Sequence, residues 1–212
     1  GVLNDGTLIL NGVTISHNDA ATGGGIWNQG DLTISHSAIV GNRSDGSGGG
    51  LHNQGIATLT NVTISGNRAA NGGGIGGGTN TLTNVTISSN QATGSGGGLN
   101  GGPANFTLRN SILAGNSAAV AGPNCGYGFT SQGYNLVDNI SGCAISGSTV
   151  GNIIGQNPRL LPLLSANGAP PTVALRGGSP AIDAGACQTA TDQRGVVRPV
   201  DGNLDGQARC DI

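Results

Sequence analysis

The chain repeats one short pattern five times, and this repeat constrains its fold more than any other feature. The five copies are GVTISHN (12–18), HSAIVGN (36–42), NVTISGN (61–67), NVTISSN (84–90) and NSILAGN (110–116). Their closing asparagines are 24, 25, 23 and 26 residues apart. The first four copies are each followed by a Gly triplet and an Ile or Leu, at 23–26, 48–51, 72–75 and 96–99. A fixed period of this length predicts a solenoid in which each repeat is one coil.

Within a repeat, apolar residues alternate as they do in strands. In the third repeat Leu59 starts one alternation, and Val62 and Ile64 continue it after a slip of one position. Such a slip indicates a corner, because side chains along one strand keep a period of two. We therefore expect these three residues to point inward, and Thr63 and Ser65 to face outward. The corresponding inward residues elsewhere are Leu10, Val13, Ile15, Ile34, Ile39, Leu82, Val85, Ile87, Leu108 and Leu113.

Composition supports an all-β fold. Lys, Glu and Met are absent and Gly reaches 42 of 212 residues, while Val, Ile and Thr favour strands. Short hexapeptide periods are typical of left-handed solenoids, so the longer coil predicts a right-handed parallel β-helix. The net charge of −2 argues against a nucleic-acid partner. No apolar run is long enough to span a bilayer.

Asparagine and glycine suit the corners of such a coil. Asparagine tolerates left-handed backbone and its amide can bond to the next coil, so two ladders are predicted. The first contains Asn18, Asn42, Asn67, Asn90 and Asn116, and the second contains Asn61, Asn84 and Asn110. The Gly triplets are expected to form a third corner, where backbone passes close to backbone.

Four cysteines lie in the C-terminal half as two local pairs, and no His cluster accompanies them. We predict two disulfides, Cys125 with Cys143 and Cys187 with Cys210, from which an oxidising, extracellular compartment follows. The chain is then divided into regular coils (1–120), irregular coils (121–157) and a C-terminal capping region (158–212). Residues 158–176 hold four of the eight prolines and a Leu cluster, and are expected to cover the last coil.

Several motifs carry a family resemblance. The GGGI/GGGL and ISxN repeats resemble those of polymorphic outer-membrane proteins. GYNLVDN (133–139), GSPAIDAG (178–185), DQRGVVRP (192–199) and the segment 201–212 resemble the choice-of-anchor Q surface β-helix proteins of bacteria. The resemblance implies a secreted or cell-surface bacterial β-helix protein, of a kind that often has a separate C-terminal anchor.

The search for a binding site points first to Trp27. Trp27, His52, Gly76 and Asn100 follow the Gly triplets at equivalent positions, so Trp27 should face outward. There it could stack on a sugar ring or lie in a subunit interface, and the alternative is an isolated surface aromatic. The histidines 17, 36 and 52 occupy different places in the coil and do not converge. Asp19 aligns with Arg43, Arg68, Gln91 and Ser117, so no acidic ladder forms.

The best local motif for a metal is the run Asp201, Asn203, Asp205, followed by Gly206. It matches the start of a calcium loop, in which hard oxygens alternate along a tight turn. The bidentate Glu of such loops is missing, since its place is Ile212. The alternative is an Asp/Gly turn held by Cys210. No other cofactor is predicted.

Three functional readings follow. The first is a non-enzymatic structural protein of the cell surface, either a passive module or a fibre subunit. The chain opens inside the repeat pattern, and an uncovered first coil would favour head-to-tail self-association. The second is an adhesin that binds carbohydrate or a host surface. The third, a polysaccharide lyase or hydrolase, would need an acidic cluster in 121–157. We expect no catalytic residues.

Overall fold

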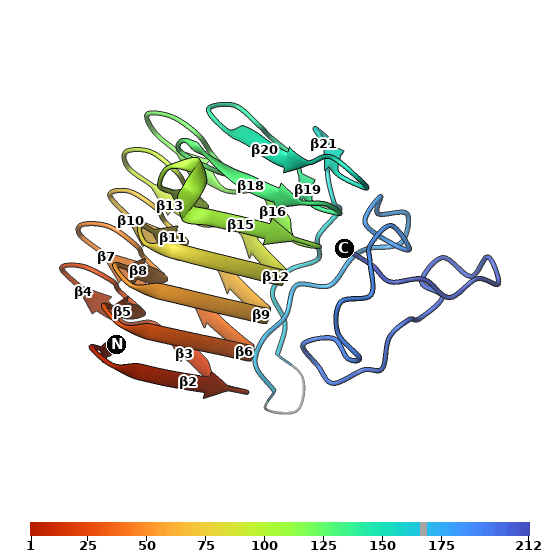
Figure 1. The fold of residues 1–212 in the computed structure, drawn as a ribbon, viewed down its shortest axis with the longest axis horizontal. Coiled ribbons are helices and arrows are strands. Elements are labelled where there is room, and N and C mark those ends of the chain that lie inside the picture. Colours follow the sequence, from red (N-terminus) through yellow and green to blue (C-terminus); the bar gives the residue numbers. More distant parts are fainter. Residues whose placement is uncertain (166–168) are drawn as a thin grey trace.

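The computed structural model describes residues 1–165 and 169–212 and shows a parallel β-solenoid of about six coils. The coils stack along one axis, and beside them lies a C-terminal region whose described residues form no named strand (Figure 1). Within the described residues there is no α-helix, and the one helical turn is the 3₁₀ segment η1 (Pro103–Asn105). The all-β parallel β-helix predicted from the repeat is confirmed.

Three stacks of parallel strands form the walls. The first is β1 (Val2–Asn4), β5 (Ile26–Asn28), β8 (Leu51–Asn53), β11 (Ile75–Gly76) and β14 (Leu99–Asn100). The second is β4 (Asp19–Ala20), β7 (Arg43–Ser44), β10 (Arg68–Ala69), β13 (Gln91–Ala92) and β17 (Ser117–Ala118). The third runs through β2 (Thr7–Asn11), β6 (Asp31–Val40), β9 (Ile56–Ser65), β12 (Thr79–Ser88), β15 (Phe106–Arg109), β18 (Gly128–Gln132) and β20 (Ala144–Ser148). Four short strands complete it, namely β3 (Thr14–Ser16), β16 (Ile112–Ala114), β19 (Leu136–Val137) and β21 (Ile153–Ile154).

The third stack is folded along a corner. His36, Asn61 and Asn84 interrupt the long strands β6, β9 and β12 with positive φ angles of 48°, 55° and 54°. Asparagine adopts this left-handed backbone more readily than most residues, so the predicted corner falls where the parity slips. The corner separates a broad face from a narrower one, which we call the flank: residues 14–16, 37–40, 62–65, 85–88, 112–114, 136–137 and 153–154.

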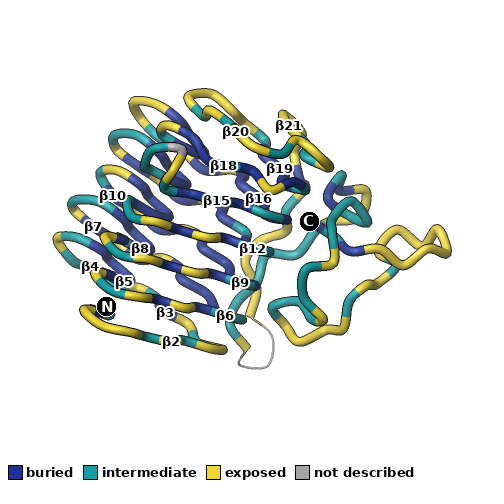
Figure 2. Tube along the Cα trace, in the orientation of Figure 1, coloured by how far each residue is buried: buried dark blue, intermediate teal, exposed yellow. Residues whose placement is uncertain are grey.

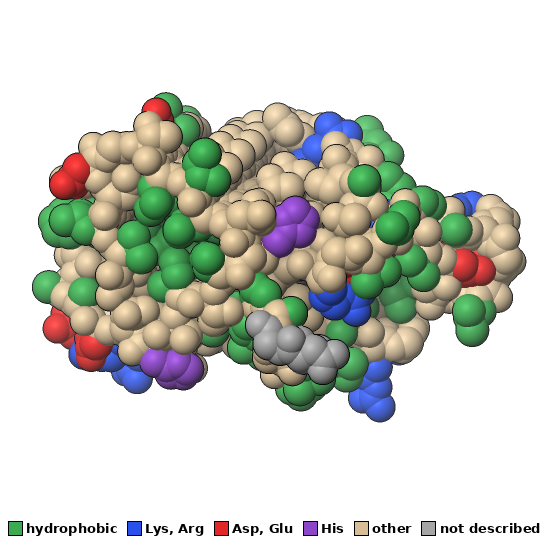
Figure 3. Space-filling model, turned by 90° about the horizontal axis from the view of Figure 1, so that it is seen from below, with side chains coloured by type: hydrophobic (Ala, Val, Ile, Leu, Met, Phe, Trp, Pro, Cys, Tyr) green, Lys and Arg blue, Asp and Glu red, His purple; other side chains and the backbone are tan. Residues whose placement is uncertain are grey.

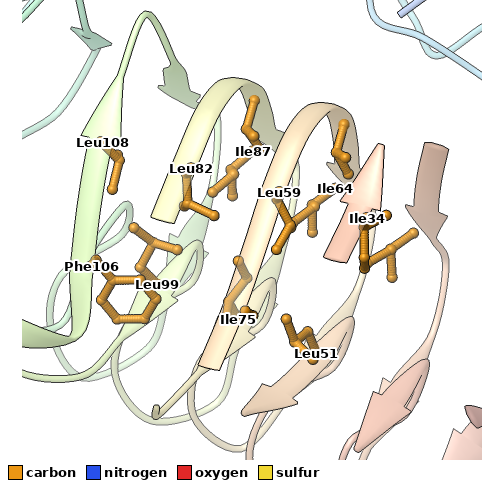
Figure 4. Packing of buried hydrophobic residues seen from close by; sticks show 14 of the residues in the cluster. Ile34, Leu51, Leu59, Ile64, Ile75, Leu82, Ile87, Leu99, Phe106 and Leu108 are labelled. Carbon is orange, nitrogen blue, oxygen red and sulfur yellow. The ribbon is translucent and has the colours of Figure 1, made fainter. Parts of the chain in front are cut away.

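The interior is a set of stacked aliphatic rows. Ile34, Leu59 and Leu82 are in direct register and fully buried (Figure 4). Buried and exposed positions alternate along each broad strand (Figure 2). The inward residues predicted from the sequence all lie in this core, although Leu10 and Val13 in the first coil are only partly buried. Like side chains lie on like because adjacent coils are only about 4.8 Å apart.

The predicted Asn row 18, 42, 67, 90 and 116 runs inside the coil. Each Nδ2 donates to Oδ1 of the next Asn in the row, at 2.9 to 3.0 Å. The expected left-handed backbone is not found at these asparagines. The residue before each of them has the positive φ instead, for example Gly41 and Ser89. This arrangement frees the asparagine to point inward, where its amide satisfies buried backbone groups.

A further buried Asn ladder was not predicted. Asn4 donates to Asn28, Asn28 to Asn53 and Asn53 to Asn80, at 2.7 to 3.0 Å. The recurring N-x-G at residues 4–6, 28–30 and 53–55 is the signal that could have revealed it.

Residues 158–212, which we call the tail, form the irregular, disulfide-stapled C-terminal region. The disulfides join Cys125 to Cys143 and Cys187 to Cys210. The position of the tail differs from the expectation that residues 158–176 cover the last coil. The tail lies along the flank, beside the strands rather than across the end of the stack (Figure 1).

Contacts along the flank explain this position. Thr63 faces outward as expected, but it is only 2% exposed because its hydroxyl donates to Gln193 Oε1 at 2.7 Å. Further along, Ile112 and Leu136 point outward and pack in a second apolar cluster with Ala181 and Ile212. These outward apolar residues need a cover, and the tail supplies it.

Candidate functional site

The Trp27 row lies on the outer side of the first stack, where the strand register pairs Trp27 with His52, His52 with Gly76 and Gly76 with Asn100. The two rings are 6.4 Å apart between centroids and inclined by 59°. Trp27 Nε1, His52 Nδ1 and Asn100 Oδ1 are buried without a hydrogen-bond partner in the described part of the chain. Burial lowers the pKa of His52, which keeps the imidazole neutral near pH 7. The row combines an aromatic pair with unused polar atoms.

The other two histidines lie at separate corners. His36 Nε2 is 3.2 Å from Asn61 Nδ2 at the edge of the flank. His17 takes the corner position that Gly41 occupies in the next coil. The strand register likewise brings Asp19 beside Arg43, with a 3.0 Å ion pair on the exposed outer surface.

The Asp201 loop is a turn held by its own carboxylates. Asp201 accepts hydrogen bonds from the backbone N–H groups of Asp205 (3.2 Å) and Gly206 (2.8 Å). Asn203 Oδ1 accepts a further bond from the Asp205 N–H, at 2.8 Å. Across residues 1–165 and 169–212, no group of three or more His, Cys, Asp or Glu side chains is arranged to hold a metal. Calcium binding by Asp201, Asn203 and Asp205 stays a prediction.

A cleft between the flank and the tail is a site that sequence reasoning missed. It has a volume of about 300 Å³ and is lined on one side by Asn61, Asn84, Thr86 and Asn110. Segments of the tail supply the opposite wall: Thr172, Leu175, Ile182, Asp192, Arg194, Arg198, Asp211 and Ile212. The walls come from parts of the chain about one hundred residues apart, so only folding of the tail onto the solenoid creates the cleft.

Charges in this cleft are unevenly paired. Arg194 donates to Asp192 through Nε at 2.8 Å, so these two neutralise each other. Arg198 Nη1 is buried and has no hydrogen-bond partner within the described residues. Burial lowers the pKa of Arg198, while Asp192 and Asp211 oppose that shift. Burial also raises the pKa of Asp211, whose Oδ1 accepts the Asp183 N–H at 2.8 Å.

At the β2 end of the solenoid, the interior is only partly covered by the described residues. Strand β2 pairs with β6 on one edge only, judged from the described strands. Val2, Leu8, Leu10 and Val13 belong to the core rows but are partly exposed here. Figure 3 looks at this end and shows hydrophobic side chains gathered on it.

Comparison with protein-family models, with curated proteins and with solved structures found no match. The fold agrees with a β-helix surface protein, and membership of the choice-of-anchor Q group stays a hypothesis. No helix in the described ranges is long and apolar enough to cross a membrane.

Proposed function

We propose that this β-solenoid is a non-enzymatic structural protein of the extracellular surface, in which molecules stack end to end. The observation that carries the proposal is the partial exposure of Leu8, Leu10 and Val13, which continue the core rows at the β2 end. When another coil covers apolar rows that reach a surface, apolar area is removed from water, and the free energy of the system falls.

The two ends of the stack are different surfaces, and each offers a strand edge and an apolar residue to the other. At the far end, β20 also has an unpaired edge within the described strands, and Ile145 lies partly buried beside the core. Because every strand of the stack runs in the same direction, β20 of one molecule would meet β2 of the next as a parallel neighbour. Such a heterologous contact repeats along the axis and produces a filament.

The disulfides support an extracellular location. Both Cys125–Cys143 and Cys187–Cys210 are formed, and structural disulfides persist in oxidising compartments. Together with the low charge of the coils, they favour a durable surface component.

Sedimentation velocity and electron microscopy at micromolar concentration test the stacking. The wild-type chain should form linear oligomers that grow with concentration. Leu10→Lys places a charge in the end surface and should give monomers. The matched control is Ile9→Lys, since Ile9 is on the same strand but 71% exposed and directed outward. Ile145→Lys should also give monomers. A wild-type chain that stays monomeric at every concentration contradicts the proposal.

Carbohydrate adhesion is the second candidate, favoured by the Trp27 row. Trp27 is partly exposed on the outer side of the first stack, where its aromatic face can stack on the apolar face of a sugar ring. Trp27→Ala should abolish retention on an immobilised polysaccharide, whereas Tyr127→Ala, an exposed aromatic outside the row, should not. Equal retention of both variants would exclude Trp27 as the binding residue.

A further inference from the structure

We propose that the cleft between the flank and the tail binds a sugar acid, a hydroxylated ring bearing one carboxylate, with Arg198 as the carboxylate partner. This site lies on the side of the solenoid, away from the end surface, and the inference is independent of stacking. It is also separate from the Trp27 row, which is on another stack of strands.

Arg198 has a hydrogen-bond donor that no group in the described residues uses. Arg198 lines the cleft, and its Nη1 is buried without a hydrogen-bond partner within the described residues. A buried guanidinium donor left unpaired costs free energy, so a ligand that accepts from it is stabilised by more than a surface contact would give. The neighbouring Arg194 is already held by Asp192, at 2.8 Å from Nε.

The shape of the guanidinium and the size of the cleft indicate the kind of anion. A guanidinium is planar and presents parallel N–H groups that fit the two oxygens of a carboxylate. A cavity of about 300 Å³ lies at the small end of the range for ligand sites and suits a single ring. We therefore expect the carboxylate that pairs with Arg198 to belong to a small molecule rather than to a long side chain of another protein.

The remaining walls of the cleft have both polar and apolar parts. Thr86 and Thr172, whose side chains carry hydroxyl groups that can bond to ligand hydroxyls, line the cleft, while Asn84 and Asp192 there already bond within the chain. Ile112, Ile182 and Ile212 form an apolar side. A pyranose ring has both characters, since its hydroxyls lie around the edge and its C–H groups form an apolar face.

Calorimetric titration of the full chain with galacturonate, galactose and acetate tests this assignment. Galacturonate should bind, and the other two should bind at least about tenfold more weakly, because each lacks one half of the recognised group. Galactose that binds equally well overturns the role of the carboxylate. Acetate that binds equally well overturns the sugar, and no binding of galacturonate overturns the site.

Variants locate the site. Arg198→Gln should weaken galacturonate binding by at least about tenfold, while Arg68→Gln, at the exposed position of β10, should leave it unchanged. Melting curves show whether Arg198→Gln keeps the fold. Thr86→Val is a milder second variant that nearly preserves shape and should weaken binding several-fold. Folded Arg198→Gln protein with wild-type affinity would falsify the proposal. The proposal would also be overturned if Thr86→Val kept wild-type affinity while Arg68→Gln lost as much affinity as Arg198→Gln.

Discussion

Asn90 Oδ1 accepts two hydrogen bonds from Asn67 in the preceding coil, one from Nδ2 and one from the backbone N–H, each 2.9 Å long. The same relationship joins Asn42 to Asn67, since the backbone N–H and Nδ2 of Asn42 both donate to Asn67 Oδ1. Asn67 Nδ2 also reaches the carbonyl of Ile39. One buried amide therefore satisfies backbone and side-chain groups in neighbouring coils.

Replacing Asn67 with Ala should be strongly destabilising. The change leaves the Ile39 carbonyl and the Asn42 amide without this partner in a site with no solvent exposure. We expect the free energy of unfolding to fall by about 3 kcal/mol, measured by chemical denaturation. Asn11→Ala is the control, because Asn11 is exposed, and it should change stability by less than about 0.5 kcal/mol. A similar small effect at Asn67 would contradict the role of the ladder.

The Gly triplets predict a second pair of variants. A Cβ on Gly49 would lie 2.5 Å from the carbonyl oxygens of Arg68 and Gly73, both of which belong to the backbone. Gly49→Ala should therefore lower the free energy of unfolding by about 2–3 kcal/mol. The matched control is Gly6→Ala, since a Cβ at Gly6 meets nothing within 4 Å. Thermal denaturation followed by circular dichroism should separate the two.

The tail disulfide should hold the tail to the flank. Cys187 and Cys210 are 23 residues apart, and the loop between them includes Thr189, which accepts from Asn84 at 2.9 Å. Replacing both cysteines with Ser should reduce stability by about 3 kcal/mol. Trypsin should then cut after Arg194 faster than in the wild-type protein. The corresponding double variant at Cys125 and Cys143, which lie outside the tail, is the control and should leave that cleavage rate nearly unchanged.

Stability should also depend on the ionisation of Asp211. Burial raises the pKa of this carboxyl above its ordinary value of 3.8, so the folded protein binds the proton more tightly than the unfolded chain. The contribution of Asp211 to stability is therefore full below pH 3.8 and is lost as pH rises through the raised pKa.

Asp211→Asn tests this dependence by removing the charge while keeping an oxygen that can accept the Asp183 N–H. The variant should melt at a higher temperature than the wild type near pH 7, and the difference should shrink as the pH is lowered. Melting temperatures that run parallel across this pH range would argue against a buried, shifted carboxyl.

The coils could be predicted from sequence because each inward position repeats its chemistry from coil to coil. The row Ile15, Ile39, Ile64 and Ile87 is one example, and its register follows from the alignment of the repeats. The same alignment predicts the register of an outward row, which contains Asp19, Arg43, Arg68, Gln91 and Ser117.

The cleft could not be predicted because its tail has no repeat to align. The surface that the tail covers does carry a signal in the sequence of the flank. The outward position that is Thr63 and Thr86 in two coils becomes Ile112 and then Leu136 in the following ones. An apolar residue at an outward position indicates that something covers it, but not which segment does so or which charges that segment brings.

Hydrogen bonds tie the tail to the corner beside the flank, at Asn61, Asn84 and Asn110, with one of these asparagines in each of three successive coils. These anchor points are spaced by the coil repeat of about 4.8 Å, whereas the distance between their partners is set by a tail closed by its own disulfide. Duplication or deletion of a coil in this stretch would shift the anchors out of step with the tail. The length of the tail must therefore match the number of coils it spans, and the two parts of the chain can only change size together.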